Sequence, residues 1–301
     1  MGTSAALHHC RRGLDTGRLM PRRAAKIARR AGRLWRRTVK LWRRARRWWR
    51  PAPPTAKFIM GALLILGLWL GSNWIYQVVR KPSELFFPVS GTLNKSPAAT
   101  WAQYAPIFRK YSTAVMTAHF LAAIAQVEGS GNPVARTYWK WSWSSQPFEV
   151  YRPASSAVGM YQITDGNFAE ARHFCIHDHA VVADGPWNDW HSCWFTGLYA
   201  RVIPGDAVEL TSAYLDRSVA TILERHRMSP APLAQKQMLA ALIHLCGAGA
   251  GDEFVRRRFR LAEGQRCGDH QARAYLEHIE AMQSVFARLD KPVYAFQGPF
   301  Q

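Results

Sequence analysis

Residues 122–133 read AAIAQVEGSGNP, an apolar run that reaches one glutamate, Glu128, and then stops at glycines and a proline. Apolar side chains recur three and four positions apart before it, which predicts a helix over 113–128 with one buried face. Glu128 falls at the edge of that face, where partial burial favours the neutral form of a carboxyl group. A neutral glutamic acid can donate a proton to a leaving oxygen. The alternative is an ordinary surface glutamate in the last helical turn.

The rest of the chain beyond residue 105 is also predicted to be mainly α-helical. Helical patterns cover residues 206–226, 233–245 and 269–289. No stretch alternates between apolar and polar side chains as a half-buried strand does. Residues 129–158 and 173–205 are therefore predicted to be long irregular loops.

Positive charge is concentrated in the N-terminal segment. Residues 1–57 carry 18 Lys and Arg and one acid, whereas the remainder carries 22 basic and 19 acidic side chains. Residues 58–79 (FIMGALLILGLWLGSNWIYQVV) then run for 22 positions without a charge. As a helix this run would be about 33 Å long, enough to cross a bilayer and too long for the core of a signal peptide. Because basic flanks stay in the cytoplasm, we expect residues 81–301 on the outer side.

The basic segment has an apolar stripe at helical spacing over residues 24–49, and the stripe includes Trp35, Trp42, Trp48 and Trp49. A basic amphipathic helix of this kind is typical of segments that lie on anionic lipid. Two alternatives stay open: a topology signal with no further role, and a binding site for an acidic cytoplasmic partner. Nucleic acid is a less favoured partner, because basic runs are generic.

Four of the five cysteines follow the apolar run, an even number that suits an oxidising compartment. Proximity in the sequence predicts the pairs Cys175–Cys193 and Cys246–Cys267. Histidines gather near the first pair, but their spacing does not match a zinc site. We therefore expect a disulfide with surface histidines, and neither a metal nor a cofactor.

A second motif lies at residues 155–164, which read SSAVGMYQIT. Gly159 permits a close approach of the backbone, and Met160, Tyr161 and Gln162 offer an apolar contact, a ring and an amide that suit a sugar. A helix ending in a glutamate and Gly-Ser-Gly-Asn-Pro, followed by Ser156-Ala-x-Gly-Met-Tyr-Gln-Ile, resembles the lytic transglycosylases with the SLT-type, goose-lysozyme-like fold. The resemblance covers roughly residues 105–290.

The resemblance implies roles for particular residues. In that family the glutamate is the catalytic acid and base, and the stretch that matches Ser156 and 159–162 lines the saccharide groove. A tyrosine on the last helix of the family matches Tyr275. The family's Tyr-Asn pair before a glycine-rich turn is His244-Leu245 here, so a substrate-contacting amide is replaced.

The resemblance also implies a reaction. The family cleaves the β-1,4 bond between N-acetylmuramic acid and N-acetylglucosamine in peptidoglycan without water and leaves a 1,6-anhydromuramoyl end. One carboxyl group is enough for this reaction, whereas a lysozyme-type hydrolase needs a second acid. Glu149, Asp165 and Glu170 are candidates for a second acid, and we favour the interpretation with Glu128 alone.

Three tryptophans, Trp139, Trp141 and Trp143, lie between the motifs and are two positions apart, so their rings share one side of an extended chain. In one interpretation they stack on sugar rings. In the other they fill space beneath a long loop, and the sequence favours neither.

The predicted organisation is a basic cytoplasmic arm (1–57), a transmembrane helix (58–79), a linker (80–104) and a lysozyme-like catalytic domain (105–301). The expected location is the bacterial inner membrane, with the catalytic domain in the periplasm. The expected partners are glycan strands, the membrane and proteins of the envelope. The alternative function is a non-catalytic peptidoglycan-binding scaffold in a secretion, conjugation or pilus machine.

Overall fold

A computed structural model describes residues 35–36, 39–43, 51, 53–86, 89–189 and 191–291. The chain divides into two compact units, Met1–Leu70 and Gly71–Gln301. Within the predicted amphipathic helix at 24–49, residues 35–36 and 39–43 are helical. The other positions of that prediction lie outside the described residues.

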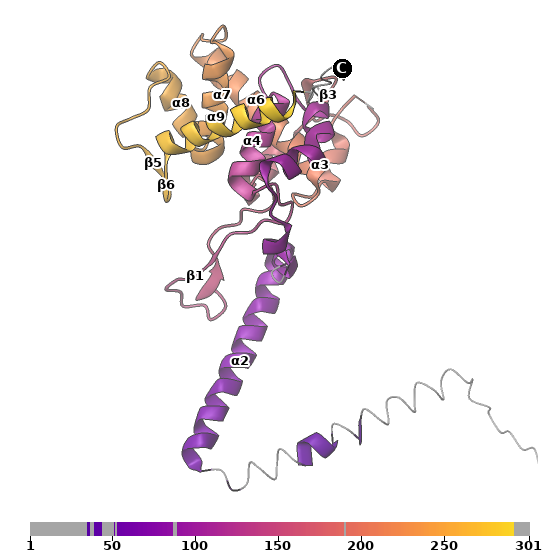
Figure 1. The fold of residues 1–301 in the computed structure, drawn as a ribbon, viewed down its shortest axis with the longest axis vertical. Coiled ribbons are helices and arrows are strands. Elements are labelled where there is room, and N and C mark those ends of the chain that lie inside the picture. Colours follow the sequence, from indigo (N-terminus) through magenta and orange to yellow (C-terminus); the bar gives the residue numbers. More distant parts are fainter. Residues whose placement is uncertain are drawn as a thin grey trace, which may run out of the picture. The chain divides into compact units, whose positions relative to one another are not determined.

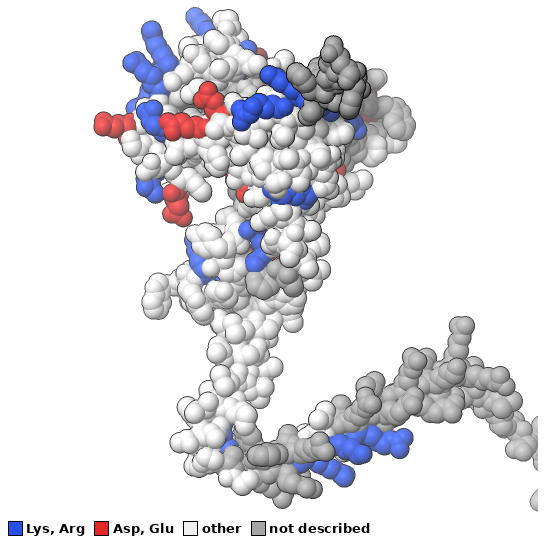
Figure 2. Space-filling model, in the orientation of Figure 1, with Lys and Arg blue, Asp and Glu red and all other residues white. Residues whose placement is uncertain are grey.

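Helix α2 (Pro54–Arg80) contains the predicted membrane span, and it extends that span by four residues at its start and one at its end. A proline is tolerated at the start of a helix because its missing N–H would have no partner there. The mean hydropathy of its most apolar window is 1.8, and among the described residues it is the one helix long and apolar enough to cross a membrane. No charged side chain interrupts the middle of α2 (Figure 2).

The second unit is mainly helical, as predicted. Figure 1 shows its principal helices gathered into one bundle, with α4 at the centre. Residues 120–125 of α4 are all buried, and α4 packs against α3 and α9. The helices of this bundle are α3 (Pro97–Lys110), α4 (Ala118–Gly129), α5 (Asp165–Ala171), α6 (Pro204–Arg225), α7 (Leu233–Cys246), α8 (Ala248–Arg256) and α9 (Ala272–Leu289).

Helix α4 begins five residues later than the apolar pattern suggests. Thr117 is its N-cap, and its side chain accepts a hydrogen bond from the backbone N–H of Phe120. Residues 113–116 form a turn instead, in which the Thr113 hydroxyl accepts from the N–H of Met116. The apolar side chain of Met116 is still fully buried, which is why the periodic pattern extends beyond the helix.

The two stretches predicted as irregular loops contain short antiparallel hairpins. Strand β1 (Trp139–Trp141) pairs with β2 (Tyr151–Pro153), and β3 (Phe174–His177) pairs with β4 (Ala180–Ala183). A third pair, β5 (Arg266–Cys267) with β6 (His270–Gln271), precedes α9. Strands of two to four residues are too short to show a clear alternation of apolar and polar side chains, so they could not be predicted from the sequence.

Both predicted disulfide bonds are confirmed. Cys175 pairs with Cys193 across a Cα–Cα distance of 5.5 Å, which fixes β3 to the segment before the 3₁₀ helix η3 (Trp194–Leu198). Cys246 pairs with Cys267 across 5.3 Å and joins the end of α7 to the β5–β6 hairpin. Two disulfides in the same unit indicate an oxidising, extracytoplasmic compartment.

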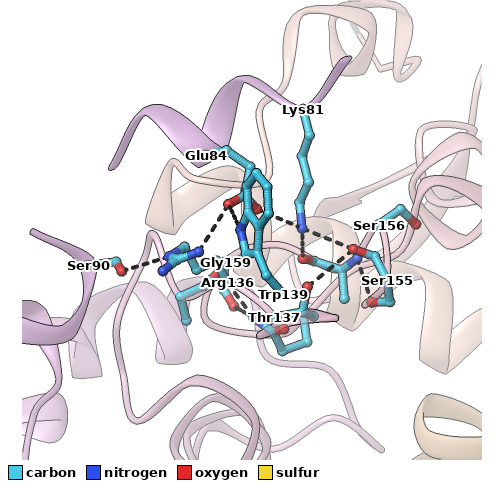
Figure 3. Close-up of polar contacts among 12 residues, drawn as sticks. Lys81, Glu84, Ser90, Arg136, Thr137, Trp139, Ser155, Ser156 and Gly159 are labelled. Atoms are coloured by element: carbon cyan, nitrogen blue, oxygen red, sulfur yellow. Dashed lines mark hydrogen bonds and ion pairs between the residues drawn. The ribbon is translucent and has the colours of Figure 1, made fainter. Parts of the chain in front are cut away.

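The region predicted as a linker is largely ordered and partly buried. It contains the 3₁₀ helices η1 (Pro82–Phe86) and η2 (Ser90–Leu93) and the start of α3. Glu84 of η1 is fully buried; its carboxylate accepts hydrogen bonds from Arg136 (3.1 Å) and Trp139 Nε1 (2.9 Å). Lys81 Nζ lies 3.3 Å from the same carboxylate. Figure 3 shows these groups converging from three parts of the chain.

This cluster of Lys81, Glu84, Arg136 and Trp139, here called the neck, fixes the end of α2 to loops of the second unit. Lys81 Nζ also donates to the backbone carbonyls of Ser155 and Ala157, at 3.1 and 2.9 Å. Burial lowers the pKa of Lys81, while the charge of Glu84 opposes that shift. A buried acid between two cations holds both of them in place, because neither cation has bulk water as a substitute.

We predict that Glu84→Gln lowers the free energy of unfolding by about 3 to 5 kcal/mol, because it removes the negative partner from a buried ion cluster. Denaturant unfolding of the full-length protein in detergent micelles measures the loss. Glu253→Gln is the matched control, since Glu253 pairs with Arg256 and Arg257 at the surface, and it should leave the unfolding midpoint nearly unchanged. Equal effects in the two variants would contradict the assignment.

Candidate active site

Glu128 is the penultimate residue of α4, and its position is fixed by a close backbone contact. The next residue, Gly129, lies against Met160, where a Cβ at position 129 would come within 2.7 Å of the Met160 Cα. The α4 helix ends there, because Ser130 adopts a left-handed conformation as its C-cap. Glycine at 129 therefore lets the 159–162 loop lie directly beside the glutamate.

The carboxylate of Glu128 is held by Tyr275 from α9. The Tyr275 hydroxyl donates to Glu128 Oε1 at 2.6 Å, a short distance typical of a charged acceptor. Burial raises the pKa of Tyr275 well above its usual value, and the charge of Glu128 and this hydrogen bond raise it further. Tyr275 therefore stays a proton donor to Glu128 at neutral pH.

A third group, His244 near the end of α7, completes the surroundings of the carboxylate. His244 Nε2 lies 3.7 Å from Glu128 Oε1, and the side chain of His244 is 7% exposed while that of Glu128 is 18% exposed. This separation is too long for a hydrogen bond in the free protein. It is short enough to become one when a bound ligand shifts either side chain.

In the sequence, His244 departs from the motif of the lytic transglycosylases, and we assigned it no role there. One signal was available: apart from Cys246, His244 is the sole ionisable side chain in the last nine residues of α7, 238–246. A polar group that follows a long apolar run in a buried helix needs a polar partner. What the sequence did not provide was the partner's identity, because Glu128 comes from a distant helix.

Glu128 opens into a cleft of about 360 Å³. The eleven described residues that line the cleft are Ser90, Gly91, Asn94, Glu128, Gly129, Ser130, Asn132, Ala135, Arg136, Thr137 and Tyr138. Glu128 is the sole acid among them. The cleft therefore presents one carboxyl group, an arginine and several amide and hydroxyl groups, a composition that suits a polar, uncharged or acidic ligand.

The 159–162 motif supports the site mainly from within the protein. The Met160 and Tyr161 side chains are fully buried, and the Tyr161 hydroxyl donates to the carbonyl of Leu121 in α4 at 3.1 Å. Position 159 requires glycine, because its φ is +81° and a Cβ there would lie 2.3 Å from the carbonyl oxygen of Arg201. Gln162 donates to the carbonyls of Ala135 and Gly159. Because the Met160 and Tyr161 side chains are buried, this structure does not present them at the surface for the predicted contact with sugar.

Three further predicted binding residues lie outside the described lining of the Glu128 cleft. The Ser156 hydroxyl accepts from the N–H of Asp165 at the start of α5. Trp139 belongs to the neck, and its ring lies 5.1 Å from that of Tyr151. Trp141 is 66% exposed, with its ring 4.6 Å from the same Tyr151 ring.

The three candidate second acids lie away from the Glu128 cleft. Glu149 is paired with Arg80 and Arg152, and Asp165 is paired with Arg201 at 2.8 Å. Glu170 lines a separate hollow of about 700 Å³ between α5, α6 and α8. None of the three is among the described residues that line the cleft of Glu128.

The histidines near Cys175 face different partners. His173 Nδ1 lies 2.6 Å from Asp184 Oδ2, and His179 Nδ1 lies 2.8 Å from the carbonyl oxygen of Ser112. The rings of His177 and His191 are 6.4 Å apart. In the part of the chain that the structure describes, no group of three or more His, Cys, Asp or Glu side chains is placed to hold a metal ion.

Comparisons of the chain with models of protein families, with curated proteins and with solved structures give no match. The choice of this cleft as the candidate site therefore depends on the geometry of its residues. Another hollow, of about 510 Å³, lies at α7 and α9, but Glu128 is not among its described lining residues. Glu128 lines the 360 Å³ cleft and accepts a hydrogen bond from Tyr275, and its neighbour Gly129 contacts Met160 of the second motif.

We predict that Tyr275→Phe lowers the free energy of unfolding by about 1.5 to 3 kcal/mol at neutral pH, because it removes a buried hydrogen bond to a charged group. Since the pKa of Tyr275 is raised in the folded state, its stabilising contribution is fully present below pH 10 and is lost as pH rises beyond that. The difference between wild type and variant should therefore shrink above about pH 10. Denaturant unfolding of both proteins between neutral and alkaline pH checks this, and a constant or growing difference would contradict it.

Proposed function

We propose that the protein is a membrane-anchored lytic transglycosylase that cleaves the glycan strands of peptidoglycan, with Glu128 as its single acid and base. One observation carries the proposal. Glu128 is the sole acid among the described residues of its cleft, and it is held by Tyr275 beside the 159–162 motif. The pattern of the two motifs, which resembles the lytic transglycosylases, supports the same assignment.

The proposed reaction needs one proton donor that later accepts a proton. Protonated Glu128 gives its proton to the oxygen that leaves C1 of the muramoyl unit, and the C1–oxygen bond breaks. The 6-hydroxyl oxygen of the same muramoyl unit then bonds to C1, and its proton passes to the Glu128 carboxylate. No water is consumed, and Glu128 ends in the protonation state in which it began.

The surroundings of Glu128 suit both halves of that cycle. Tyr275 donates to one carboxylate oxygen, Oε1, which orients the carboxyl group and stabilises it when it is charged. The other oxygen is then available to the substrate. The charged partners of Glu149 and Asp165 favour a single-acid reaction over hydrolysis, which requires a second carboxylate across the scissile bond.

Two further hollows lie in the same unit, although neither shares a described lining residue with the Glu128 cleft. His244, beside Glu128, also lines a small pocket with Asn167 and Tyr214. Tyr214 in turn lines the hollow between α5, α6 and α8, together with Gly249 from the glycine-rich turn that follows His244-Leu245.

The proposed location follows from the charge pattern and the disulfides. Helix α2 would be a single transmembrane span, with the basic residues 1–57 in the cytoplasm by the positive-inside rule. The two disulfides would then lie in the periplasm, where the wall substrate lies. A domain tethered to the outer face of the inner membrane would meet glycan strands while it remains attached to the membrane.

We predict that Glu128→Gln lowers the turnover of purified sacculi by at least about 100-fold, because it removes the general acid and base. The amide oxygen still accepts from Tyr275, so the fold should be retained. Mass spectrometry of the muropeptides released by full-length protein in detergent measures the products. Glu149→Gln is the control and should retain the wild-type rate.

Three results would contradict the proposal. Equal product from wild type and Glu128→Gln would remove Glu128 from the reaction. Reducing-end products would indicate a lysozyme-type hydrolase. Binding to sacculi without any product in either protein would support the alternative, a scaffold of an envelope machine that retains the groove but has no activity.

We further predict that His244→Gln lowers kcat roughly tenfold, equivalent to about 1.4 kcal/mol of transition-state stabilisation, with a smaller change in KM. The reason is that His244 lies beside the carboxyl group whose charge changes during the reaction. Steady-state kinetics on soluble glycan fragments separate the two constants. A change confined to KM would instead make His244 a binding residue.

A further inference from the structure

The β1–β2 hairpin and its loop carry an unusual density of exposed aromatic side chains that the proposed reaction does not use. Six of the sixteen residues 138–153 are aromatic. Trp141 is 66% exposed and Trp143 is fully exposed, and neither is among the described residues lining the Glu128 cleft. Exposed apolar rings gathered on one segment are typical of a surface that contacts a membrane or another protein.

The hairpin is attached to the C-terminal end of α2. Asn73 and Gln77, one helical turn apart, donate from their side-chain amides to the backbone carbonyls of Tyr151 (2.8 Å) and Phe148 (2.7 Å). Both amide side chains are buried, and the Tyr76 ring stacks on Phe148 at 5.3 Å. Figure 1 shows the hairpin alongside the last turns of α2. These amides satisfy backbone carbonyls that would be costly to leave unpaired in lipid.

The depth of the hairpin follows from its contacts along α2. Arg80 is the first charged residue after the uncharged run, and Asn73 precedes it by seven residues, or about 10 Å of helix. The headgroup region of one leaflet is about 5 to 7 Å thick. Trp141 is paired in register with Tyr151, whose carbonyl meets Asn73, so Trp141 falls near the boundary between headgroups and hydrocarbon.

Charges mark the outer limit of this arrangement. Arg80 pairs with Glu149, and Glu149 also pairs with Arg152. This ion cluster meets α2 at Arg80. Trp141 is in register with Tyr151, which contacts α2 seven residues earlier, at Asn73. Tryptophan is the side chain that most favours the membrane interface. Lys140 and Arg152 are paired one position from Trp141 and Tyr151, and long basic side chains can extend from that depth to the headgroups.

We propose that the β1–β2 hairpin inserts Trp141 and Trp143 into the lipid interface of the outer leaflet, beside the last two turns of α2. The neck then links this anchor to the cleft, because Trp139 on β1 and Arg136 of the cleft wall both bond Glu84. Anchor and span together fix the height and tilt of the active site above the bilayer. This inference rests on the span proposed above and not on the glycan chemistry.

The test measures lipid contact at single positions in the full-length protein in nanodiscs. In a Cys10→Ser background, Trp143→Cys carries a bimane label, and lipids with a nitroxide near the headgroup quench it. Trp187→Cys is the matched control, because Trp187 is also an exposed tryptophan, at 80%, in a loop far along the chain from α2. Leu66→Cys, in the middle of α2, with lipids labelled deeper in the chain, reports insertion of the span itself.

The proposal predicts several-fold stronger lipid quenching at position 143 than at 187, and weaker quenching at 143 by aqueous iodide. Equal behaviour at 143 and 187, with position 66 quenched, would overturn the proposal while leaving the span intact. Absence of quenching at position 66 would overturn both. Protection of position 143 from iodide by glycan fragments, without lipid quenching, would make the hairpin a sugar platform and would also overturn the proposal.

Discussion

The candidate site depends on one close contact between backbones, that of Gly129 with Met160. A side chain at 129 would collide with the Met160 backbone, so the end of α4 and the 159–162 loop can meet only because position 129 is glycine. That contact places Glu128 beside a loop that is otherwise internal. It also lets Tyr161 reach back to the α4 backbone, which makes helix and loop one rigid unit around the carboxylate.

The rigid unit is then completed from the opposite end of the chain. Tyr275 comes from the last described helix, and its hydroxyl selects one oxygen of Glu128. His244 arrives from α7, whose end is fixed by the disulfide to Cys267. Residues far apart in sequence therefore converge on one carboxyl group, and each is held by its own helix. This preorganisation is what an acid–base reaction requires, since the positions of the proton donor and acceptor determine the rate.

The sequence predicted the helical class, the disulfide pairs and the long apolar helix, because periodicity, cysteine count and length are local signals. It also singled out Glu128 and Tyr275, and the structure brings them into contact. It did not predict that Met160 and Tyr161 point into the core, because a motif identifies residue types and not the direction of their side chains. The neck was missed for a similar reason: Glu84 lies in a proline-rich stretch that looks like a linker. Its burial depends on Arg136 and Trp139, which come from a distant part of the chain, as well as on nearby Lys81.

The central claim is that one carboxyl group, Glu128, cleaves a glycosidic bond without water. The most direct measurement is digestion of sacculi by the full-length protein in water enriched with a heavy oxygen isotope, followed by mass analysis of the new chain ends. The account predicts anhydro ends that carry none of the heavy isotope. New ends that contain the heavy oxygen would show that water attacks the sugar, and the single-acid account would then be wrong.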